Sequence, residues 1–122
     1  MKSALVVDDS DATRAFIKSL IEDIGDIRVS EASTGFEALK SLPQQSFDVI
    51  TVDINMPDIN GLELINFVKG NDQYKTIPVI IISTEGSEED KKKGLSLGAV
   101  AYITKPFKSE DLQRTVKKAL NL

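Results

Sequence analysis

Short hydrophobic runs alternate with longer amphipathic segments along the chain. Five runs have the length of a β-strand and cover residues 4–7, 27–32, 47–52, 78–82 and 100–103. The first and fourth runs are hydrophobic throughout, which is typical of central strands that are covered on both faces. A segment with helical spacing of its apolar residues follows each run. This alternation predicts a parallel sheet whose strands are joined by crossover helices.

The segments between these runs carry hydrophobic stripes of unequal strength. Four stripes have clear helical spacing, and their members are Phe16, Ile17, Leu20, Ile21 and Ile24, then Ala38, Leu39 and Leu42, then Leu64, Ile65 and Val68, and last Leu112, Val116, Ala119 and Leu120. The remaining segment, over residues 87–97, has only Leu95 and Leu97 as apolar anchors and contains Gly94, which weakens a helix. We therefore expect this fourth helix to be the most mobile.

Five strands with crossover helices predict a doubly wound α/β fold, with one parallel sheet and helices on both of its faces. The second and fifth runs are the least apolar, so they belong at the edges of the sheet. A chain of 122 residues is long enough for one well-buried core and too short for two domains. In such sheets ligands bind beyond the carboxyl ends of the strands. The functional residues should therefore lie at those ends.

The composition narrows the range of functions. The formal charge is -4 and no Lys- or Arg-rich block is present, which argues against direct nucleic-acid binding. No hydrophobic run approaches the roughly 20 residues that span a bilayer, so we expect no membrane insertion. With no cysteine in the chain, a cytoplasmic location is expected. Histidine is also absent, which excludes imidazole bases, Ser-His triads and nearly all zinc sites, so any chemistry must use carboxylates, lysine and hydroxyl groups.

Polar residues follow the predicted strands where a ligand site is expected: Asp8 and Asp9 after the first, Asp53 after the third, Ser83 and Thr84 after the fourth, and Lys105 after the fifth. Each has an ordinary structural explanation when it is taken alone. The acidic pair, with Ser10, could cap the next helix, Asp53 could begin a turn, and Lys105 could belong to a loop. Their joint occurrence at the predicted carboxyl edge favours a shared site.

Charge balance indicates what such a site would bind. Three carboxylates placed together repel one another, and Lys105 supplies only one compensating charge. A divalent cation would balance the set, and Mg²⁺ fits best because the available ligands are all oxygen atoms. A metal beside a carboxylate creates a place for a transferred phosphoryl group. Asp53 is then the nucleophile we select, while Lys105 pairs with the phosphoryl group and Ser83 donates its hydroxyl to it.

These residues resemble a known family, the receiver domains of bacterial two-component response regulators, and especially the stand-alone, CheY-like chemotaxis regulators. The motifs that carry the resemblance span the whole chain and are Asp8-Asp9-Ser10, Asp53-Ile54-Asn55-Met56-Pro57 with Gly61, Ser83, and Lys105-Pro106-Phe107. The resemblance implies a flavodoxin-like sheet of order 2-1-3-4-5 and a single receiver domain over residues 1–122 without an output domain. It also implies a cis peptide bond between Lys105 and Pro106.

The same resemblance assigns roles to residues. Asp53 would be the phosphorylation site, and Mg²⁺ would be held by Asp8, Asp9, Asp53 and the backbone carbonyl of Asn55. Lys105 would contact the phosphoryl group. The protein would catalyse its own phosphorylation and a slow self-dephosphorylation, and it would not be a turnover enzyme.

The resemblance further implies how a signal is read out. The Ser83 hydroxyl would swing toward the phosphoryl group and Tyr102 would turn inward, which changes the surface of the fourth helix, fifth strand and fifth helix. Asn55 and Glu85 would modulate water access and thus the lifetime of the phosphoryl group. From the residues alone, Tyr102 is equally well explained as an edge-strand aromatic, and Asn55 and Glu85 as two solvated loop residues.

The implied partners are a sensor histidine kinase as phosphodonor and a downstream protein, such as a motor-switch protein or a histidine-containing phosphotransfer protein. We expect a monomer that acts in chemotaxis or motility signalling. The alternatives are a phosphorelay shuttle and a receiver-like interaction module that is never phosphorylated. A flavodoxin-type electron carrier fits less well because the acidic turn after the first strand would repel a flavin phosphate. An aspartyl phosphatase also fits less well, because its first-strand acids are separated by one residue.

Overall fold

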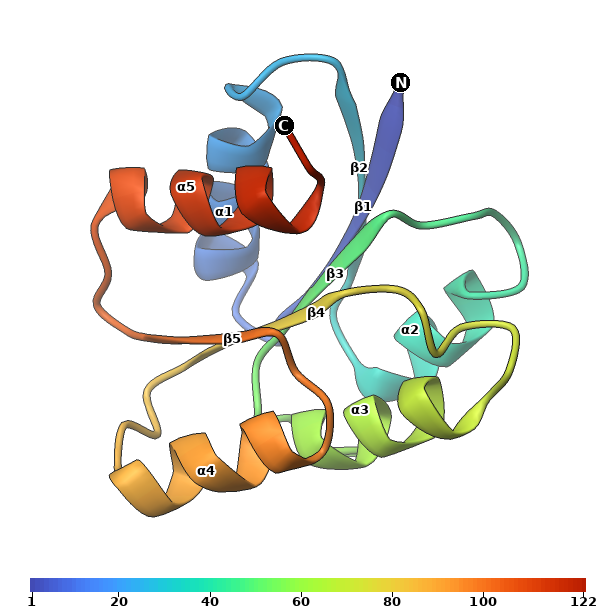
Figure 1. The fold of residues 1–122 in the computed structure, drawn as a ribbon, viewed down its shortest axis with the longest axis vertical. Coiled ribbons are helices and arrows are strands. Elements are labelled where there is room, and N and C mark those ends of the chain that lie inside the picture. The colour runs from blue at the N-terminus through green and yellow to red at the C-terminus, as the bar shows by residue number, and fades with distance from the viewer.

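The computed structural model describes residues 1–122 as an α/β fold in three layers, with one sheet between two layers of helices (Figure 1). The strands are β1 (Lys2–Val7), β2 (Ile27–Ala32), β3 (Val49–Val52), β4 (Val79–Ser83) and β5 (Ala101–Thr104). The helices are α1 (Asp11–Glu22), α2 (Gly35–Ser41), α3 (Gly61–Gly70), α4 (Glu88–Ser96) and α5 (Ser109–Ala119). The strands are parallel, in the order β2-β1-β3-β4-β5. The predicted sheet and its two edge strands are confirmed.

Side chains of the strands alternate between two hydrophobic cores. Helices α1 and α5 cover one face of the sheet, and α2, α3 and α4 cover the other (Figure 1). Ala4 and Val6 of β1 belong to the core beneath α1 and α5, whereas Leu5 and Val7 belong to the opposite core. Strands β3 and β4 consist of buried residues along their whole length, as central strands should.

Polar caps begin four of the helices close to the carboxyl ends of the strands. The side chains that cap α1, α2, α3 and α4 each accept a hydrogen bond from the backbone N–H three residues later, and they belong to Ser10, Thr34, Asn60 and Ser87. Each bond satisfies a donor that the first turn of a helix leaves free. Asn60 and Glu63 form a complete capping box. Short-range chemistry therefore fixes where these helices begin.

The helices are short. The longest, α1, has 12 residues, and none of the helices has the length and hydrophobicity that a membrane crossing requires.

The bounds of four strands differ from the sequence prediction by one or two residues at one or both ends. β1 begins earlier, because Lys2 and Ser3 also pair with β2. β3 begins at Val49 rather than at residue 47. The carboxylate of Asp48 accepts a hydrogen bond from the N–H of Ser3, and Phe47 packs in the core ahead of the strand. β4 and β5 each begin and end one residue later than predicted.

Two apolar residues are exposed instead, one from a predicted hydrophobic stripe and one predicted to anchor the fourth helix. Phe16 is 49 % exposed and stacks on Phe107 with ring centroids 6.0 Å apart, so it stays outside the core. Leu95 of α4 is 46 % exposed. The buried position of α4 is Gly94, where an added Cβ would collide with Cδ1 of Ile81. Helix α4 thus approaches the sheet through its glycine, and its mobility stays a prediction.

Candidate functional site

The residues predicted from the strand ends lie together at the carboxyl ends of the parallel strands: Asp8 and Asp9 follow β1, Asp53 follows β3, Ser83 ends β4, and Lys105 follows β5. Sheet hydrogen bonds hold them in register, because the N–H of Asp53 donates to the carbonyl of Val7 (3.0 Å). The N–H of Lys105 donates likewise to the carbonyl of Ser83 (2.8 Å). Thr84, in contrast, is exposed just beyond β4.

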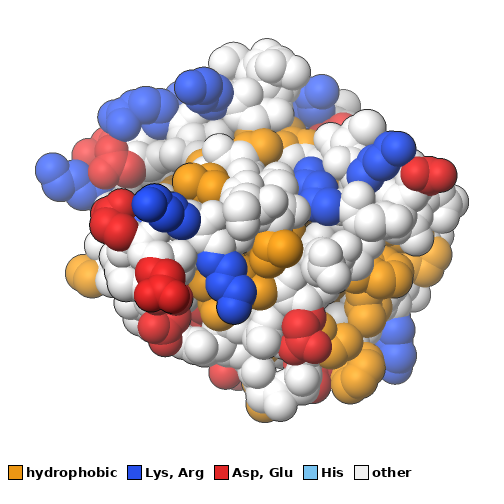
Figure 2. Space-filling model, turned by 60° about the horizontal axis from the view of Figure 1, so that its bottom comes forward, with side chains coloured by type: hydrophobic (Ala, Val, Ile, Leu, Met, Phe, Trp, Pro, Cys, Tyr) orange, Lys and Arg blue, Asp and Glu red, His pale blue; other side chains and the backbone are white.

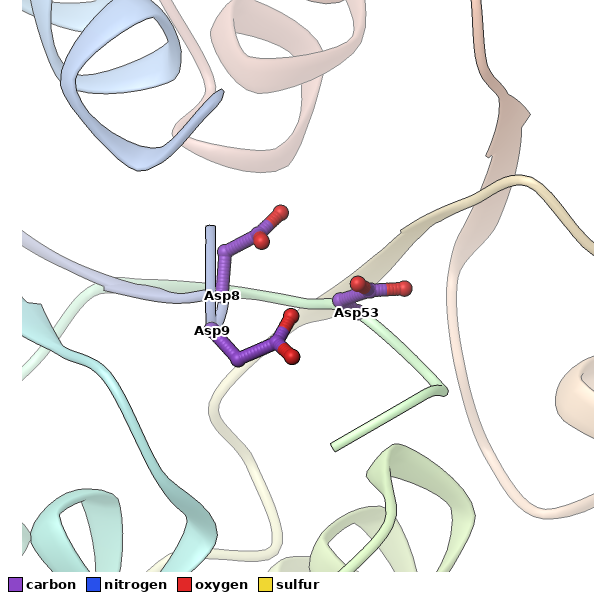
Figure 3. Close-up of side chains that lie close together, drawn as sticks. All are labelled: Asp8, Asp9 and Asp53. Atoms are coloured by element: carbon purple, nitrogen blue, oxygen red, sulfur yellow. The ribbon is translucent and has the colours of Figure 1, made fainter. Parts of the chain in front are cut away.

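Three carboxylates converge from the ends of two adjacent strands (Figure 3). One oxygen atom from each of Asp8, Asp9 and Asp53 lies within 4.8 Å of the other two. Asp8 is 1 % exposed and Asp53 is 7 % exposed, whereas Asp9 faces solvent. The donors are all oxygen atoms, and one side of the cluster is open to water. This arrangement suits Mg²⁺, which binds through a small number of carboxylates and keeps several water ligands.

Lys105 supplies the positive charge beside the cluster. Its Nζ lies 2.8 Å from Oδ2 of Asp8 and 3.5 Å from Oδ2 of Asp53, and only 15 % of its side chain is exposed. The peptide bond from Lys105 to Pro106 is cis, as predicted. With three carboxylates and one ammonium group, the site retains two uncompensated negative charges. One divalent cation would neutralise them.

The environment of Asp53 disfavours its ionised form. Burial raises the pKa of the Asp53 carboxyl group above its ordinary value, the ammonium group of Lys105 opposes this increase, and the negative charge of Asp8 adds to it. Lys105 alone therefore does not compensate the carboxylate fully. A bound cation would favour the ionised form, which is the form that can act as a nucleophile.

A glycine allows the loop after Asp53 to fold back against the site. A Cβ at Gly61 would collide with the backbone carbonyl of Asp53, so a side chain cannot be placed there. The N–H of Gly61 donates to the carbonyl of Ile54 (2.9 Å). Within this loop, the N–H of Asn55 donates to Oδ1 of Asp53 (3.4 Å). The backbone of Asn55 is thereby held next to the carboxylate cluster, where the predicted metal ligand is required.

Glu85 connects the residues that were predicted to switch. Its N–H donates to Oγ of Ser83 (3.1 Å), and its carbonyl accepts a hydrogen bond from the hydroxyl of Tyr102. Its carboxylate accepts a hydrogen bond from the side-chain amide of Asn55 (2.9 Å). Ser83 is fully buried, and burial raises the pKa of the Tyr102 hydroxyl. A displacement of Ser83 can therefore reach Tyr102 through the backbone of one residue.

Arg14 was not singled out by the sequence, yet it touches the site. Its Nη1 donates to the backbone carbonyl of Asp8 (2.9 Å), while Nη2 and Nε donate to the carboxylates of Asp11 and Glu31. The available signal was an arginine in the helix that follows the acidic pair. That signal has meaning only when β2, which carries Glu31, is known to lie beside β1.

The fold and the acidic cluster define the class of protein. The model of the response regulator receiver domain family matches residues 4–117, and the chain belongs to this family. It is 38 % identical over 117 residues to the chemotaxis protein CheY1 of Helicobacter pylori, covering 95 % of this chain and 94 % of that protein. It is 32 % identical over 114 residues to the chemotaxis protein CheY of Pseudomonas aeruginosa, covering 93 % and 92 % respectively.

Solved structures give the same picture. The chemotaxis protein CheY4 of Vibrio cholerae superposes with a TM-score of 0.90 at 38 % identity, covering 98 % of this chain and 99 % of that chain. The receiver domain of the Francisella response regulator 1452 superposes with a TM-score of 0.91 at 35 % identity, covering 99 % and 98 %. The electron-carrier and phosphatase interpretations are thereby left without support, and the CheY-like resemblance is confirmed.

Proposed function

We propose that this receiver domain accepts a phosphoryl group on Asp53 from a histidine kinase in a magnesium-dependent step. The observation that carries the proposal is the place of the Asp53 carboxylate, which lies buried within the three-acid cluster and 3.5 Å from Nζ of Lys105. We treat residues 1–122 as one receiver domain. In this proposal the protein is a switch that catalyses its own phosphorylation and slow dephosphorylation, and it is not a turnover enzyme.

The transfer would use groups that already converge. An oxygen of Asp53 forms a bond to phosphorus, the bond from phosphorus to the donor's imidazole nitrogen breaks, and the imidazole leaves with that electron pair. Lys105 would pair with the phosphoryl oxygens as a point charge, and Ser83 would donate its hydroxyl to one of them. Mg²⁺, when bound, neutralises charge on the transferred group. Its proposed ligands are Asp8, Asp9, Asp53 and the backbone carbonyl of Asn55.

Intact-mass measurement after incubation with a small phosphodonor tests this proposal. The wild-type protein should gain the mass of one phosphoryl group with Mg²⁺ and little without it. Asp53→Ala should abolish the gain, whereas Asp72→Ala should keep it, because the Asp72 side chain is 98 % exposed and lies outside the site. Label that persists on Asp53→Ala, or that forms without metal, would contradict the proposed roles. A wild-type protein that gains no mass would instead favour the interaction module that is never phosphorylated.

The proposed readout runs from Ser83 to Tyr102. If Ser83 turns its hydroxyl toward the phosphoryl group, it gives up the hydrogen bond from the N–H of Glu85. The carbonyl of Glu85 holds the Tyr102 hydroxyl, so the aromatic side chain would be released to turn inward. Ser83→Ala should therefore still be phosphorylated, but the amide NMR signals of α4 and β5 should shift less than in the wild type. Equal shifts in both proteins would remove Ser83 from the readout.

Asn55 and Glu85 are proposed to set the lifetime of the phosphoryl group. Their side chains are exposed and hydrogen-bonded to each other at 2.9 Å, between the loop after Asp53 and the loop after β4. This bridge would limit the approach of water to the phosphoryl group. Replacing either residue by alanine should change the rate of dephosphorylation while phosphorylation continues. An unchanged rate in both variants would exclude them from this role.

The surface of α4, β5 and α5 is the proposed docking face for a downstream protein. Leu95 of α4 and Val100 before β5 are exposed hydrophobic residues, 46 % and 55 % exposed respectively. Figure 2, which turns the lower side of the molecule in Figure 1 forward, shows acidic, basic and hydrophobic side chains interspersed. Such a mixture is compatible with a protein partner. Because relatives are named chemotaxis proteins, we favour a motor-switch protein as the downstream partner over a histidine-containing phosphotransfer protein. We further propose that the protein acts as a monomer in the cytoplasm.

A further inference from the structure

Arg14 joins three segments around the acidic pair. Its guanidinium group donates to the carbonyl of Asp8 in the loop after β1 (2.9 Å), to Asp11 in the first turn of α1 (2.8 Å) and to Glu31 of β2 (3.2 Å). Only 14 % of its side chain is exposed, which is unusually little for a charged residue. Lys18 also lies 3.5 Å from Glu31, which fixes that carboxylate from a second side. Arg14 is therefore held in one place.

The contact with the carbonyl of Asp8 bears on both acids of the pair. That carbonyl belongs to the planar peptide group between Asp8 and Asp9. Holding this group in place therefore restricts the direction in which the side chain of Asp9 points. The carboxylate of Asp8 has further support from Lys105 (2.8 Å) and from the N–H of Ser10 (2.9 Å). The exposed carboxylate of Asp9 has no such protein donor, so its orientation depends on its backbone.

Two effects of Arg14 on a cation have opposite signs. As a positive charge close to the cluster, the guanidinium group repels Mg²⁺ and weakens its binding. As a support for the Asp8–Asp9 peptide group, it keeps two ligands in place and strengthens binding. A planar group with donors in a fixed fork can hold three acceptors at once, which a lysine ammonium group on a flexible stem does not reproduce. Arginine and lysine at this position therefore separate the two effects.

We infer that Arg14 is a positioning residue for the magnesium site, and that it strengthens Mg²⁺ binding by holding the peptide group between Asp8 and Asp9. The inference rests on the proposed magnesium-dependent function. It deepens that function by extending the site to a residue that touches neither the metal nor the phosphoryl group. The geometric effect exceeds the repulsion, because the guanidinium charge is largely compensated by Asp11 and Glu31.

The test is calorimetric titration of metal-free protein with MgCl₂, at a temperature where every variant is folded. Arg14→Gln and Arg14→Lys should both raise the dissociation constant for Mg²⁺ roughly tenfold, the low end of the range for groups that support metal ligands. Arg114→Gln is the matched control. It removes an arginine that pairs with an aspartate three residues earlier, Asp111 (3.0 Å), on the exposed surface of α5, and it should leave the affinity unchanged.

Leu112→Ala separates positioning from general stability. It opens a cavity in the core beneath α1 and α5, so it should lower the unfolding temperature, yet it should leave Mg²⁺ affinity unchanged. An Arg14→Gln protein that binds Mg²⁺ as the wild type does overturns the inference. The inference is also overturned if Arg14→Gln binds Mg²⁺ more tightly than the wild type while Arg14→Lys binds it equally well. Removal of the positive charge would by itself explain that result. Wild-type protein that binds no Mg²⁺ overturns the proposed function as well, whereas normal Mg²⁺ binding without phosphorylation of Asp53 overturns the proposed function alone.

Discussion

Helices α1 and α4 begin alike and are anchored very differently. Each follows the carboxyl end of a central strand, and each starts with a serine cap, Ser10 and Ser87, that accepts a hydrogen bond from the N–H three residues later. α1 then buries Ile17, Leu20 and Ile21. α4 buries only Gly94. Local capping chemistry is thus sufficient to begin a helix, while the side chains beyond the first turn decide how firmly it is attached to the sheet.

This difference in anchoring matches the two roles proposed for the regions around α1 and α4. α1 begins just after the acidic pair and carries Arg14, so the proposed metal ligands Asp8 and Asp9 lie next to a firmly packed helix. α4 adjoins Tyr102 and Glu85, where the readout is proposed, and Gly94 is its only buried residue. Elements that move in a switch come from the less stable parts of a domain.

Truncation of one hydrophobic side chain on each helix gives the largest difference. Ile21→Ala should lower the free energy of unfolding by about 3 kcal/mol, because the side chain of Ile21 in α1 is fully buried against the sheet. Leu95→Ala should change it by less than about 0.5 kcal/mol, because Leu95 is largely in solvent. Urea denaturation of both variants measures the two values. Similar losses would mean that α4 is anchored as firmly as α1.

Native-state amide exchange should show the same contrast without mutation. The central amides of α4 should exchange through openings that cost about 2 kcal/mol less than those of α1 and α5, a roughly thirtyfold difference in rate. The reason is the single buried position of α4 against Leu112 and Val116 in α5 and three buried residues in α1. Equal protection of α4 and α5 would count against a mobile α4.

Gly94→Ala examines how α4 meets the sheet. Alanine favours a helix over glycine, but the added methyl group would collide with Ile81 and lie 3.3 Å from Cδ2 of Tyr102. We expect a net loss of about 1 kcal/mol, with shifted NMR signals for the Tyr102 ring.

Gly70→Ala is the control for this comparison. Gly70 ends α3, and nothing lies within 4 Å of a Cβ built there. The change should stabilise by about 0.5 kcal/mol, since it lowers only the entropy of the unfolded chain. If Gly94→Ala were stabilising to the same degree, the close approach of α4 would not constrain the helix.

The smallest expected change in stability comes from Asp53, in the acidic cluster near the start of α1. Its pKa is raised in the folded protein, so the folded state binds this proton more tightly than the unfolded state does. Stability of the metal-free protein should therefore fall as the pH rises from the ordinary value of 3.8 through the raised pKa. Asp53→Asn should remove this loss and stabilise by about 1 kcal/mol or less at neutral pH.

Thermal unfolding at several pH values measures the effect. The advantage of Asp53→Asn over the wild type should shrink toward acid pH, where the wild-type carboxyl group is protonated in both states. Asp72→Asn, at an exposed carboxylate, should give no comparable gain. An Asp53→Asn protein that is less stable than the wild type at neutral pH would contradict the inferred destabilisation by the buried charge.

The sheet and the acidic cluster could be predicted because both follow from patterns along the chain. Uninterrupted apolar runs identified β1 and β4 as central strands, and the topology of a parallel sheet brings the carboxyl ends of its strands together. Asp8, Asp53 and Lys105 could therefore be grouped before any contact was known, although their roles stay predictions.

The missed features depend on contacts between distant segments. Phe16 has the spacing of a core residue, but Phe107 from the loop after β5 covers its ring at the surface. Gly94 has no side chain, so a hydrophobic pattern cannot identify it as the buried position of α4. The role inferred for Arg14 depends on Glu31 in the neighbouring strand β2. Periodicity describes one element at a time, and each of these features arises where two elements meet.

The ion pair between Lys105 and Asp8 joins residues 97 positions apart in the sequence. Contacts between such distant positions carry a large loop-closure entropy and form only once the intervening structure has assembled. β5 pairs only with β4, so Lys105 reaches the acidic cluster when the sheet is complete. In a chain whose sheet is incomplete, the ammonium group of Lys105 would not lie beside the carboxylates of the proposed acceptor site. The proposed acceptor site is therefore assembled only in the fully folded domain.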